Sequence, residues 1–458
     1  MIFGKFKELH FVGIGGAGMS GIAEILHNLG YKITGSDIRK SEVTDHLEQL
    51  GIEVYQGHDG QNIGTTNVVV ISSAVDTENP EVAEAKRLNI PIIKRAEMLG
   101  ELMRLKYSIG VAGTHGKTTT TSMIGKIFTD ASFDPTVIVG GIVAGKGSGA
   151  SLGAGEYLVA EADEYDRSFL SMFPSMAVIT NIEPDHLDCY DGMADLENCF
   201  LEYMNRTPFY GGVVFSADDV VLARLQDRIK RTSTTFGFSE TADYRAFDFR
   251  LTEGGSVFTV QKNGENQGQI IMHVPGRYNA QNALAAVTAA MELDVPFEKI
   301  ADSLLDFRGV TRRFEIKSTV DNIIVVDDYA HHPTEIIATL SAAKDSYNRR
   351  VIAVFQPHLY SRTRQFYREF TEALNIADIV FLVDIYPARE EPIEGVTSEM
   401  ISQYALQKGY DQVQYIGAKE NAVEEVLKVA KSGDMVITVG AGSIYRINPE
   451  IVRGLENR

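Results

Sequence analysis

The chain has 458 residues, of which 44% are hydrophobic and 23% charged, a composition typical of a globular protein with several domains. Its 62 acidic residues outnumber 43 basic ones, and the net charge of −19 argues against a general binder of nucleic acid or of anionic membranes, because both need a basic face. No segment approaches the ~18 consecutive apolar residues that span a bilayer. The N-terminus also lacks the apolar core of a signal peptide. We therefore expect a cytoplasmic protein, without nucleic-acid or membrane partners, whose two cysteines, Cys189 and Cys199, are reduced thiols.

The first hundred residues alternate short β-branched runs with amphipathic segments. Residues 9–14 and 31–37 predict strands, residues 18–30 predict a helix between them, and residues 66–75 and 90–95 continue the series. This alternation favours a parallel sheet covered by helices. It predicts a Rossmann-like N-terminal domain over residues 1–98.

The pattern restarts with a strand at Tyr107 and predicts a central domain over residues 99–312. A helix is expected at residues 118–130, followed by strands at 136–141, 156–164 and 176–186 and a second strong helix at 277–293. Residues 144–155 are too rich in glycine for the interior of a helix or strand, so we expect a loop there. Strict alternation over residues 243–274 indicates an antiparallel insertion with a turn near residues 262–266.

The last part of the chain, residues 313–458, contains four strands of the buried type. They are expected at residues 322–330, 349–358, 377–387 and 434–442, with helical segments between them. The sequence thus predicts an α/β protein of three domains. The first and last are Rossmann-like, and the central one is a mostly parallel sheet of the P-loop ATPase kind that carries an antiparallel β insertion.

A first glycine-rich turn follows the first strand. Gly13, Gly15 and Gly18 fit the pattern G-x-G-x-x-G, which lets the backbone and a helix N-terminus approach a diphosphate. Asp37 ends the next strand, where an acidic side chain usually meets a ribose hydroxyl. The turn predicts a site for a nucleotide diphosphate but does not identify the nucleotide. The alternative is a tight turn that binds no ligand.

A second glycine-rich turn begins about a hundred residues later and reads Gly113-Thr-His-Gly-Lys117-Thr118. It departs from the P-loop pattern because position 111 is valine, yet the strand, glycines, lysine, threonine and helix remain. Backbone N–H groups of residues 114–119 would hold phosphates, Lys117 would supply charge and Thr118 would bind Mg²⁺. The alternative, threonines that only cap the helix, explains neither the lysine nor the two glycines.

Glu161 and His186 lie at the ends of two later strands of the same domain. Because the carboxyl ends of parallel strands meet at one edge of a sheet, both are expected near the second turn. Carboxylate oxygens suit Mg²⁺, so the sequence predicts a magnesium site there. A histidine alone is more often structural, but the neighbouring Asp185 and Asp188 favour a functional role for His186.

The motifs "GTHGKTTTT", "EADE", "NIEPDHLD", "PGRYNAQNALAA", "TRRFE" and "VDDYAHHPTE" together resemble the Mur ligase family of peptidoglycan synthesis. The N-terminal "HFVGIGGAGMSGIAEIL" and the later "FQPH" and "SRTR" extend the resemblance from residue 8 to about residue 445, in the same order. Such a succession is far more specific than either glycine turn alone.

The resemblance implies roles for particular residues. The UDP-sugar-binding residues would be Gly15, Gly16, Ala17, Gly18, Met19, Ser20, Asp37 and Ser73. The ATP-binding residues would be Gly113, Thr114, His115, Gly116, Lys117, Thr118, Thr119, Asn279, Asn282, Arg313 and Asp328. The amino-acid-binding residues would be Tyr329, His332 and Arg362, with His331 beside them. Thr118, Glu161 and His186 would hold Mg²⁺, and the catalytic group would comprise Lys117, Glu161, His186 and Arg313.

The resemblance also implies an activity. ATP would phosphorylate the lactyl carboxylate of UDP-N-acetylmuramate, and L-alanine would attack the acyl phosphate to form an amide. Residues 187–209 contain no lysine, whereas several related ligases carry a carbamylated lysine in this region; this favours the alanine-adding branch and leaves a second metal site open. We expect a monomer or a weak dimer.

Three other interpretations of the sequence remain. One is a ligase that joins a murein tripeptide to the same nucleotide sugar. Another is a nicotinamide-dependent oxidoreductase with a regulatory ATP site, and the third is a nucleotide sensor without turnover. The sequence names no base for the amine proton, and it leaves the role of His115 open between contact with phosphate and packing of the loop.

Overall fold

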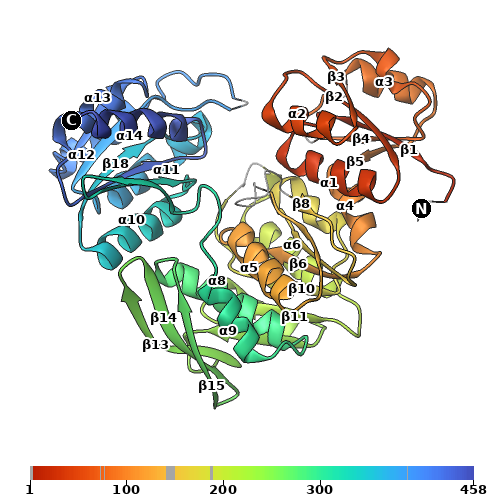
Figure 1. Ribbon diagram of the computed structural model, residues 1–458, viewed down its shortest axis with the longest axis horizontal. Coiled ribbons are helices and arrows are strands. Elements are labelled where there is room, and N and C mark those ends of the chain that lie inside the picture. Colours follow the sequence, from red (N-terminus) through yellow and green to blue (C-terminus); the bar gives the residue numbers. More distant parts are fainter. Residues whose placement is uncertain (1–3, 73, 77, 141–149, 186–188, 389) are drawn as a thin grey trace. The chain divides into compact units, whose positions relative to one another are not determined.

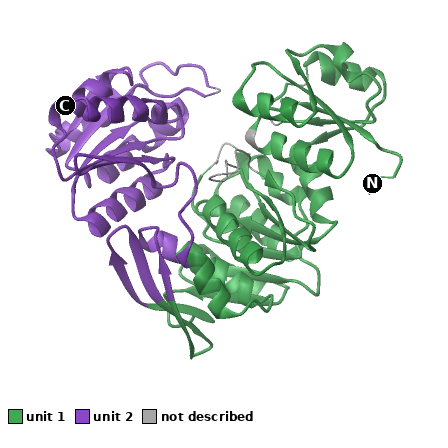
Figure 2. Ribbon diagram, viewed as in Figure 1, with its two compact units in different colours: residues 1–247, 259–269, 281–304 green, residues 248–258, 270–280, 305–458 purple. Residues whose placement is uncertain are grey.

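The computed structural model describes residues 4–72, 74–76, 78–140, 150–185, 189–388 and 390–458. The chain divides into two compact units (Figure 2). One comprises residues 1–247, 259–269 and 281–304, and the other comprises residues 248–258, 270–280 and 305–458. Three sheets carry the fold (Figure 1), and each lies within one of the three predicted domains. The domain boundaries themselves stay a prediction.

The first sheet is parallel throughout and has the strand order β3-β2-β1-β4-β5. Its strands are β1 (Glu8–Val12), β2 (Lys32–Asp37), β3 (Glu53–Gln56), β4 (Val68–Ile71) and β5 (Ile92–Lys94). Its helices are α1 (Ala17–Asn28), α2 (Glu42–Gln49), α3 (Pro80–Arg87) and α4 (Arg95–Met103). Apolar residues of β1 and α1, such as Phe11 and Ile22, are fully buried. The Rossmann-like prediction for this part is confirmed, and the first glycine turn lies at the carboxyl end of the central strand.

The second sheet has the order β15-β14-β13-β12-β11-β10-β6-β9-β7-β8. Its strands are β6 (Tyr107–Ala112), β7 (Thr136–Ile138), β8 (Ala150–Ser151), β9 (Tyr157–Glu161), β10 (Met176–Ile179), β11 (Gly212–Ser216), β12 (Ser233–Gly237), β13 (Tyr244–Thr252), β14 (Gly255–Lys262) and β15 (Glu265–Met272). The helices are α5 (Lys117–Asp130), α6 (Met193–Asn205), α7 (Val220–Leu225), α8 (Arg277–Met291) and α9 (Phe297–Leu305). Strands β7, β9, β6, β10, β11 and β12 are parallel, as predicted.

The predicted β insertion is confirmed as the meander β13–β14–β15 at one edge of this sheet. Asn263 and Gly264 connect β14 to β15 with positive φ angles of 48° and 89°, as a type I′ hairpin turn requires. The glycine-rich stretch 144–155, however, is not entirely a loop. Ala150 and Ser151 form β8, which pairs antiparallel with β7, while residues 144–149 lie outside the described residues. Backbone pairing with a neighbouring strand outweighs local composition there.

The third sheet has the order β16-β17-β21-β18-β19-β20. Its strands are β16 (Glu315–Val320), β17 (Ile323–Asp328), β18 (Arg350–Phe355), β19 (Ile379–Val383), β20 (Val413–Gly417) and β21 (Asp434–Val439). The helices are α10 (Pro333–Tyr347), α11 (Tyr360–Leu374), α12 (Glu399–Lys408), α13 (Asn421–Val429) and α14 (Asn448–Glu456). The four predicted strands are confirmed. The two edge strands β16 and β20 were not predicted, because their largely unburied residues give no continuous apolar run.

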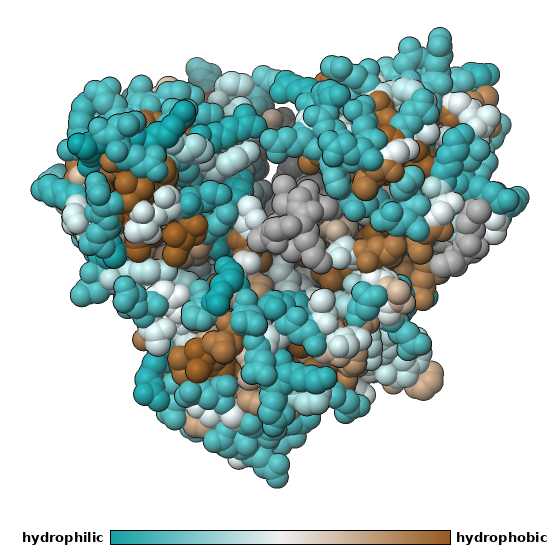
Figure 3. Space-filling model, in the orientation of Figure 1, coloured by the Kyte–Doolittle hydropathy of each residue, from teal (hydrophilic) through white to brown (hydrophobic). Residues whose placement is uncertain are grey.

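The face drawn in Figure 3 carries mainly hydrophilic residues, with hydrophobic residues in separate groups. Within the described ranges, no helix is long and apolar enough to cross a membrane.

Candidate active site

The second glycine turn joins β6 to α5 and is held by the end of β10. The N–H of Thr114 donates to the Asn181 carbonyl at 3.1 Å, and that of His115 donates to Asn181 Oδ1 at 2.8 Å. Thr180 Oγ1 and Asn181 Nδ2 both donate to the carbonyl of His115, at 2.6 and 3.1 Å. These bonds fix the short loop, and they do not involve the N–H groups of Gly116 to Thr119, which are predicted to hold phosphate.

Gly116 cannot be replaced without disturbing this loop. Its φ is +84°, which side chains rarely adopt, and a Cβ would lie 2.3 Å from Asn282 Oδ1. Asn282 of α8 therefore contacts the turn directly, and its role in ATP binding stays a prediction. The other predicted asparagine, Asn279, is buried and donates from Nδ2 to the Pro275 carbonyl at 2.7 Å.

Lys117 forms a buried ion pair that the sequence did not predict. Its Nζ lies 2.7 and 3.0 Å from the two carboxylate oxygens of Glu164 and also donates to the Gly113 carbonyl at 2.6 Å. Only 12% of the Lys117 side chain and 2% of the Glu164 side chain are exposed. Burial raises the pKa of Glu164 against the lowering effect of the ammonium. Burial also acts to lower the pKa of Lys117, but nearby carboxylates, Glu164 first, raise it overall.

Thr118 and Glu161, the two described members of the predicted magnesium site, are in contact. Thr118 Oγ1 donates to the carboxylate of Glu161 at 3.0 and 3.2 Å, and the N–H of Gly140 donates to Glu161 Oε2 at 2.8 Å. A hydroxyl and a carboxylate side by side are hard oxygen donors of the kind that Mg²⁺ prefers, so these residues fit the ion. The third predicted ligand, His186, lies outside the described residues.

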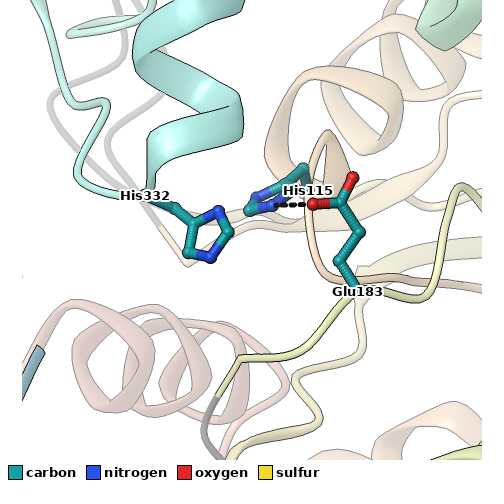
Figure 4. A group of neighbouring side chains, drawn as sticks. All are labelled: His115, Glu183 and His332. Atoms are coloured by element: carbon teal, nitrogen blue, oxygen red, sulfur yellow. Dashed lines mark ion pairs between the residues drawn. The ribbon is translucent and has the colours of Figure 1, made fainter. Parts of the chain in front are cut away.

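His115, whose role the sequence left open, faces an acidic side chain. Its Nε2 lies 3.5 Å from Glu183 Oε2, and the two side chains point toward each other in Figure 4. The residue before His115 also bonds to Glu183, because the backbone N–H of Glu183 donates to the side-chain oxygen Thr114 Oγ1 at 2.8 Å. The loop thus holds the imidazole beside a carboxylate, two residues before Lys117.

The first glycine turn is held by the end of β2. The N–H groups of Gly13 and Ile14 donate to the Ser36 carbonyl at 2.9 and 3.0 Å, and that of Gly15 donates to Asp37 Oδ2 at 2.9 Å. Asp37, expected at a ribose, therefore also fixes the turn itself.

A cavity of about 230 Å³ lies beside the first glycine turn, within the first compact unit. One wall carries Gly16, Gly18 and Met19 of the first turn. The other wall includes Glu161 and Asp163, beside the second turn. Of the other residues predicted for the nucleotide sugar, Ala17 begins α1, Ser20 is buried in the same helix, and Ser73 lies outside the described residues. The first turn and Glu161, which accepts a hydrogen bond from Thr118 of the second turn, thus line the same cavity.

In the other unit, Asp328 and Arg313 gather at the carboxyl end of β17. Asp328 accepts hydrogen bonds from the N–H groups of Phe314 and Ala330 at 2.7 and 2.8 Å. Burial raises the pKa of Asp328 to about 6, against the lowering effect of Arg313. The Arg313 guanidinium lies 5.1 Å from the ring centre of Tyr329, so these three predicted residues form one cluster.

The segments predicted to hold the amino acid also meet within this unit. The ring of His331 lies 5.8 Å from that of His358, which follows β18, and the ring of His332 lies 5.1 Å from Phe366 in α11. His332 and Arg362 are both buried. The exits of β17 and β18 therefore lie together, as the predicted group Tyr329, His332 and Arg362 requires.

Comparison with known protein families gives three matches in chain order. The description "Mur ligase family, catalytic domain" matches residues 8–107, "Mur ligase middle domain" matches residues 111–290, and "Mur ligase, glutamate ligase domain" matches residues 312–442. The chain belongs to the Mur ligase family. The resemblance inferred from its motifs is therefore confirmed.

Individual Mur ligases are similar to this chain over its whole length. The UDP-N-acetylmuramate–L-alanine ligase of Geotalea daltonii is 49% identical over 99% of both chains. The crystal structure of the UDP-N-acetylmuramate–alanine ligase from Thermotoga maritima superposes with a TM-score of 0.83 at 29% identity, covering 98% of this chain and 99% of that one. A murein peptide ligase from Psychrobacter arcticus has the same fold, with a TM-score of 0.72 at 24% identity and the same coverage of the two chains.

Sequence reasoning missed several residues that shape the site of this Mur ligase. Glu164 neutralises Lys117, and Asn181 anchors the second turn. Arg312, next to the predicted Arg313, lies 3.2 Å from Asp327 and donates to the Gly440 carbonyl at 2.6 Å. The only signal for Glu164 and Asn181 is their place within the quoted motifs. Their partners are 47 and 66 residues away in the chain, and no local pattern encodes such a pairing.

Proposed function

We propose that this protein joins L-alanine to the lactyl carboxylate of UDP-N-acetylmuramate at the expense of ATP, as a cytoplasmic step in the synthesis of peptidoglycan precursors. The observation that carries the proposal is the cavity lined by the first glycine turn and by Glu161, which accepts a hydrogen bond from Thr118 of the second turn. A sugar whose diphosphate is bound at Gly16 and Gly18 can extend through this space toward Glu161. The relatives that are about 49% identical over the full length support the choice of alanine as the amino acid.

The activation step transfers the γ-phosphoryl group of ATP to the carboxylate, because an unactivated carboxylate has no adequate leaving group. The N–H groups at the start of α5 and the ammonium of Lys117 would bind the phosphates. Thr118 and Glu161, with His186 as the predicted third ligand, would hold Mg²⁺, which when bound neutralises charge on the phosphates. Catalysis by these residues is mainly positioning and electrostatic stabilisation.

The amide-forming step follows at the acyl phosphate. The alanine amine attacks the acyl carbon, the C–O bond to phosphate breaks, and inorganic phosphate leaves with the bonding electron pair. We assign Tyr329, His332 and Arg362 to the binding of alanine, with Arg313 and Asp328 on the nucleotide side. Their arrangement around the exits of β17 and β18 supports this division. We further propose that the protein acts as a monomer or a weak dimer.

One assay tests the function: release of phosphate from ATP with UDP-N-acetylmuramate, with and without L-alanine. We expect rapid release that requires all three substrates and yields a product larger by one alanine residue. A competition assay with L-alanine and the tripeptide L-Ala-γ-D-Glu-meso-diaminopimelate tests the alternative of a tripeptide ligase, because it shows which of the two is joined to the nucleotide sugar faster. Preference for the tripeptide, or binding of NADPH in place of the nucleotide sugar, would contradict the proposal.

A further inference from the structure

Arg95 is a cavity residue to which the motifs assigned no role. It begins α4, directly after β5, and lines the cavity together with Gly16, Gly18 and Met19 of the first turn. It belongs to the same sheet and helix layers as that turn, so its position relative to the turn is set by the N-terminal fold itself.

The side chain of Arg95 lies directly against the backbone of the first turn. A Cβ placed on Gly18 would be 2.8 Å from Arg95 Nη1 and 3.2 Å from its Cδ. Any side chain at position 18 would therefore displace the guanidinium. The third glycine of the motif thus admits an arginine beside the first residues of α1, whose N–H groups point toward a bound diphosphate.

No described acidic residue forms an ion pair with the guanidinium of Arg95. In the described part of the chain, no hydrogen bond involves this guanidinium either. The other charged residues that line the cavity are Glu161 and Asp163, and both are acidic. A guanidinium presents a planar set of N–H donors that matches a phosphate oxygen pair. Among the described residues that line the cavity, Arg95 is therefore the one cationic group, and it lies on the side of the first turn.

We propose that Arg95 binds the diphosphate of the nucleotide sugar, adding side-chain charge to a turn that otherwise offers backbone N–H groups. The assignment rests on the proposed function for the identity of the sugar, but the diphosphate interaction can be measured without turnover. Contact with Gly18 favours the diphosphate over the lactyl carboxylate, which must reach the wall formed by Glu161. The whole protein, with its net charge of −19, attracts no anion by its overall field, so a local cation at this place matters.

The test compares Arg95→Ala and Arg95→Lys with the wild type by titration calorimetry with UDP, with UDP-N-acetylmuramate and with ATP. Loss of a charge-assisted, two-pronged contact predicts that both uridine ligands bind roughly 10- to 100-fold more weakly to Arg95→Ala. Arg95→Lys should fall between the two because it keeps the charge and loses the planar fork. ATP binding should be unchanged in both. The matched control is Arg87→Ala, which removes an equal charge from an exposed pair with Glu84 in the same domain.

The outcomes separate cleanly. A loss confined to UDP-N-acetylmuramate, with UDP unaffected, would move Arg95 to the lactyl carboxylate and overturn the diphosphate assignment, as would unchanged binding of both ligands. Equal thermal unfolding midpoints for Arg95→Lys and the wild type show that a weakened affinity is not a folding defect. If the wild type binds UDP but does not ligate alanine, the proposed function fails while the UDP titrations still decide the role of Arg95.

Discussion

Removing the ammonium of Lys117 should impair stability as well as catalysis. This side chain is the counterion of Glu164, whose side chain is 2% exposed and whose carboxylate lies 2.7 Å from Nζ. Lys117→Met leaves that carboxylate buried without a partner, and breaking such a pair costs about 3–5 kcal/mol. By contrast, Lys126→Ala in the same helix removes an exposed pair with Asp130 and should cost no more than about 0.5 kcal/mol.

The double variant Lys117→Met, Glu164→Gln separates the two effects. It removes both charges, so most of the lost stability should return, whereas ATP-dependent ligation should stay absent in both variants. Thermal and urea unfolding of the four proteins, followed by circular dichroism, measures the stability. Calorimetry with UDP checks that the nucleotide-sugar site of the first domain is intact in each.

The stability of Lys117→Met should also depend on pH, in a direction that the pKa of Glu164 determines. Burial raises the pKa of Glu164, so without Lys117 the folded protein favours the neutral acid. The stability of Lys117→Met should therefore be highest below the ordinary pKa of 4.5 and should fall as the pH rises through the elevated folded value. A single variant as stable as the wild type at pH 8, or a double variant no more stable than the single one, would refute the reasoning.

Three further predictions concern other parts of the first compact unit. Burial acts to raise the pKa of Glu81, but hydrogen bonds to it outweigh burial and lower the pKa from 4.5 to about 2; stability from this group is complete above pH 4.5 and is lost as the pH falls toward 2. Glu81→Gln should therefore cost about 3 kcal/mol at pH 7 and flatten the acid limb of the stability profile in urea unfolding; an unchanged acid limb would count against this. Gly116→Ala drives a Cβ against Asn282, so ATP titrations should lose at least about tenfold in affinity with UDP binding preserved; unaltered ATP binding would exclude the clash. Glu161→Gln should raise the magnesium concentration needed for half-maximal ligation, and an identical magnesium titration would remove it from the metal site.

Much of the fold was predictable because buried parallel strands and covering helices leave periodic patterns in the sequence. The positions of Lys117, Thr118 and Glu161 followed from strand ends that meet at one edge of a sheet, and their contacts agree with that expectation. The edge strands β16 and β20 were missed because a strand at the rim of a sheet needs no continuous apolar run.

The remaining features depend on tertiary partners. The backbone N–H of His115 was expected at a phosphate, yet it bonds to Asn181, which is 66 residues away. The carboxylate of Asp37 was expected at a ribose, yet it also accepts the N–H of Gly15. Arg95 belongs to no glycine motif, and its relation to Gly18 exists only once β5 has paired with β4. A local sequence pattern can predict which type of side chain lies at a site, but not which residue, distant in the sequence, contacts it.

The pairing of Lys117 with Glu164 has a consequence for the proposed binding of phosphate at this loop. A phosphate that approaches the loop does not meet an unoccupied ammonium but competes with an internal anion for it. If Lys117 binds the phosphates, as we propose, nucleotide affinity at this loop is the difference between two ion pairs. Small changes around Glu164 can tune that difference without altering any residue that touches the nucleotide.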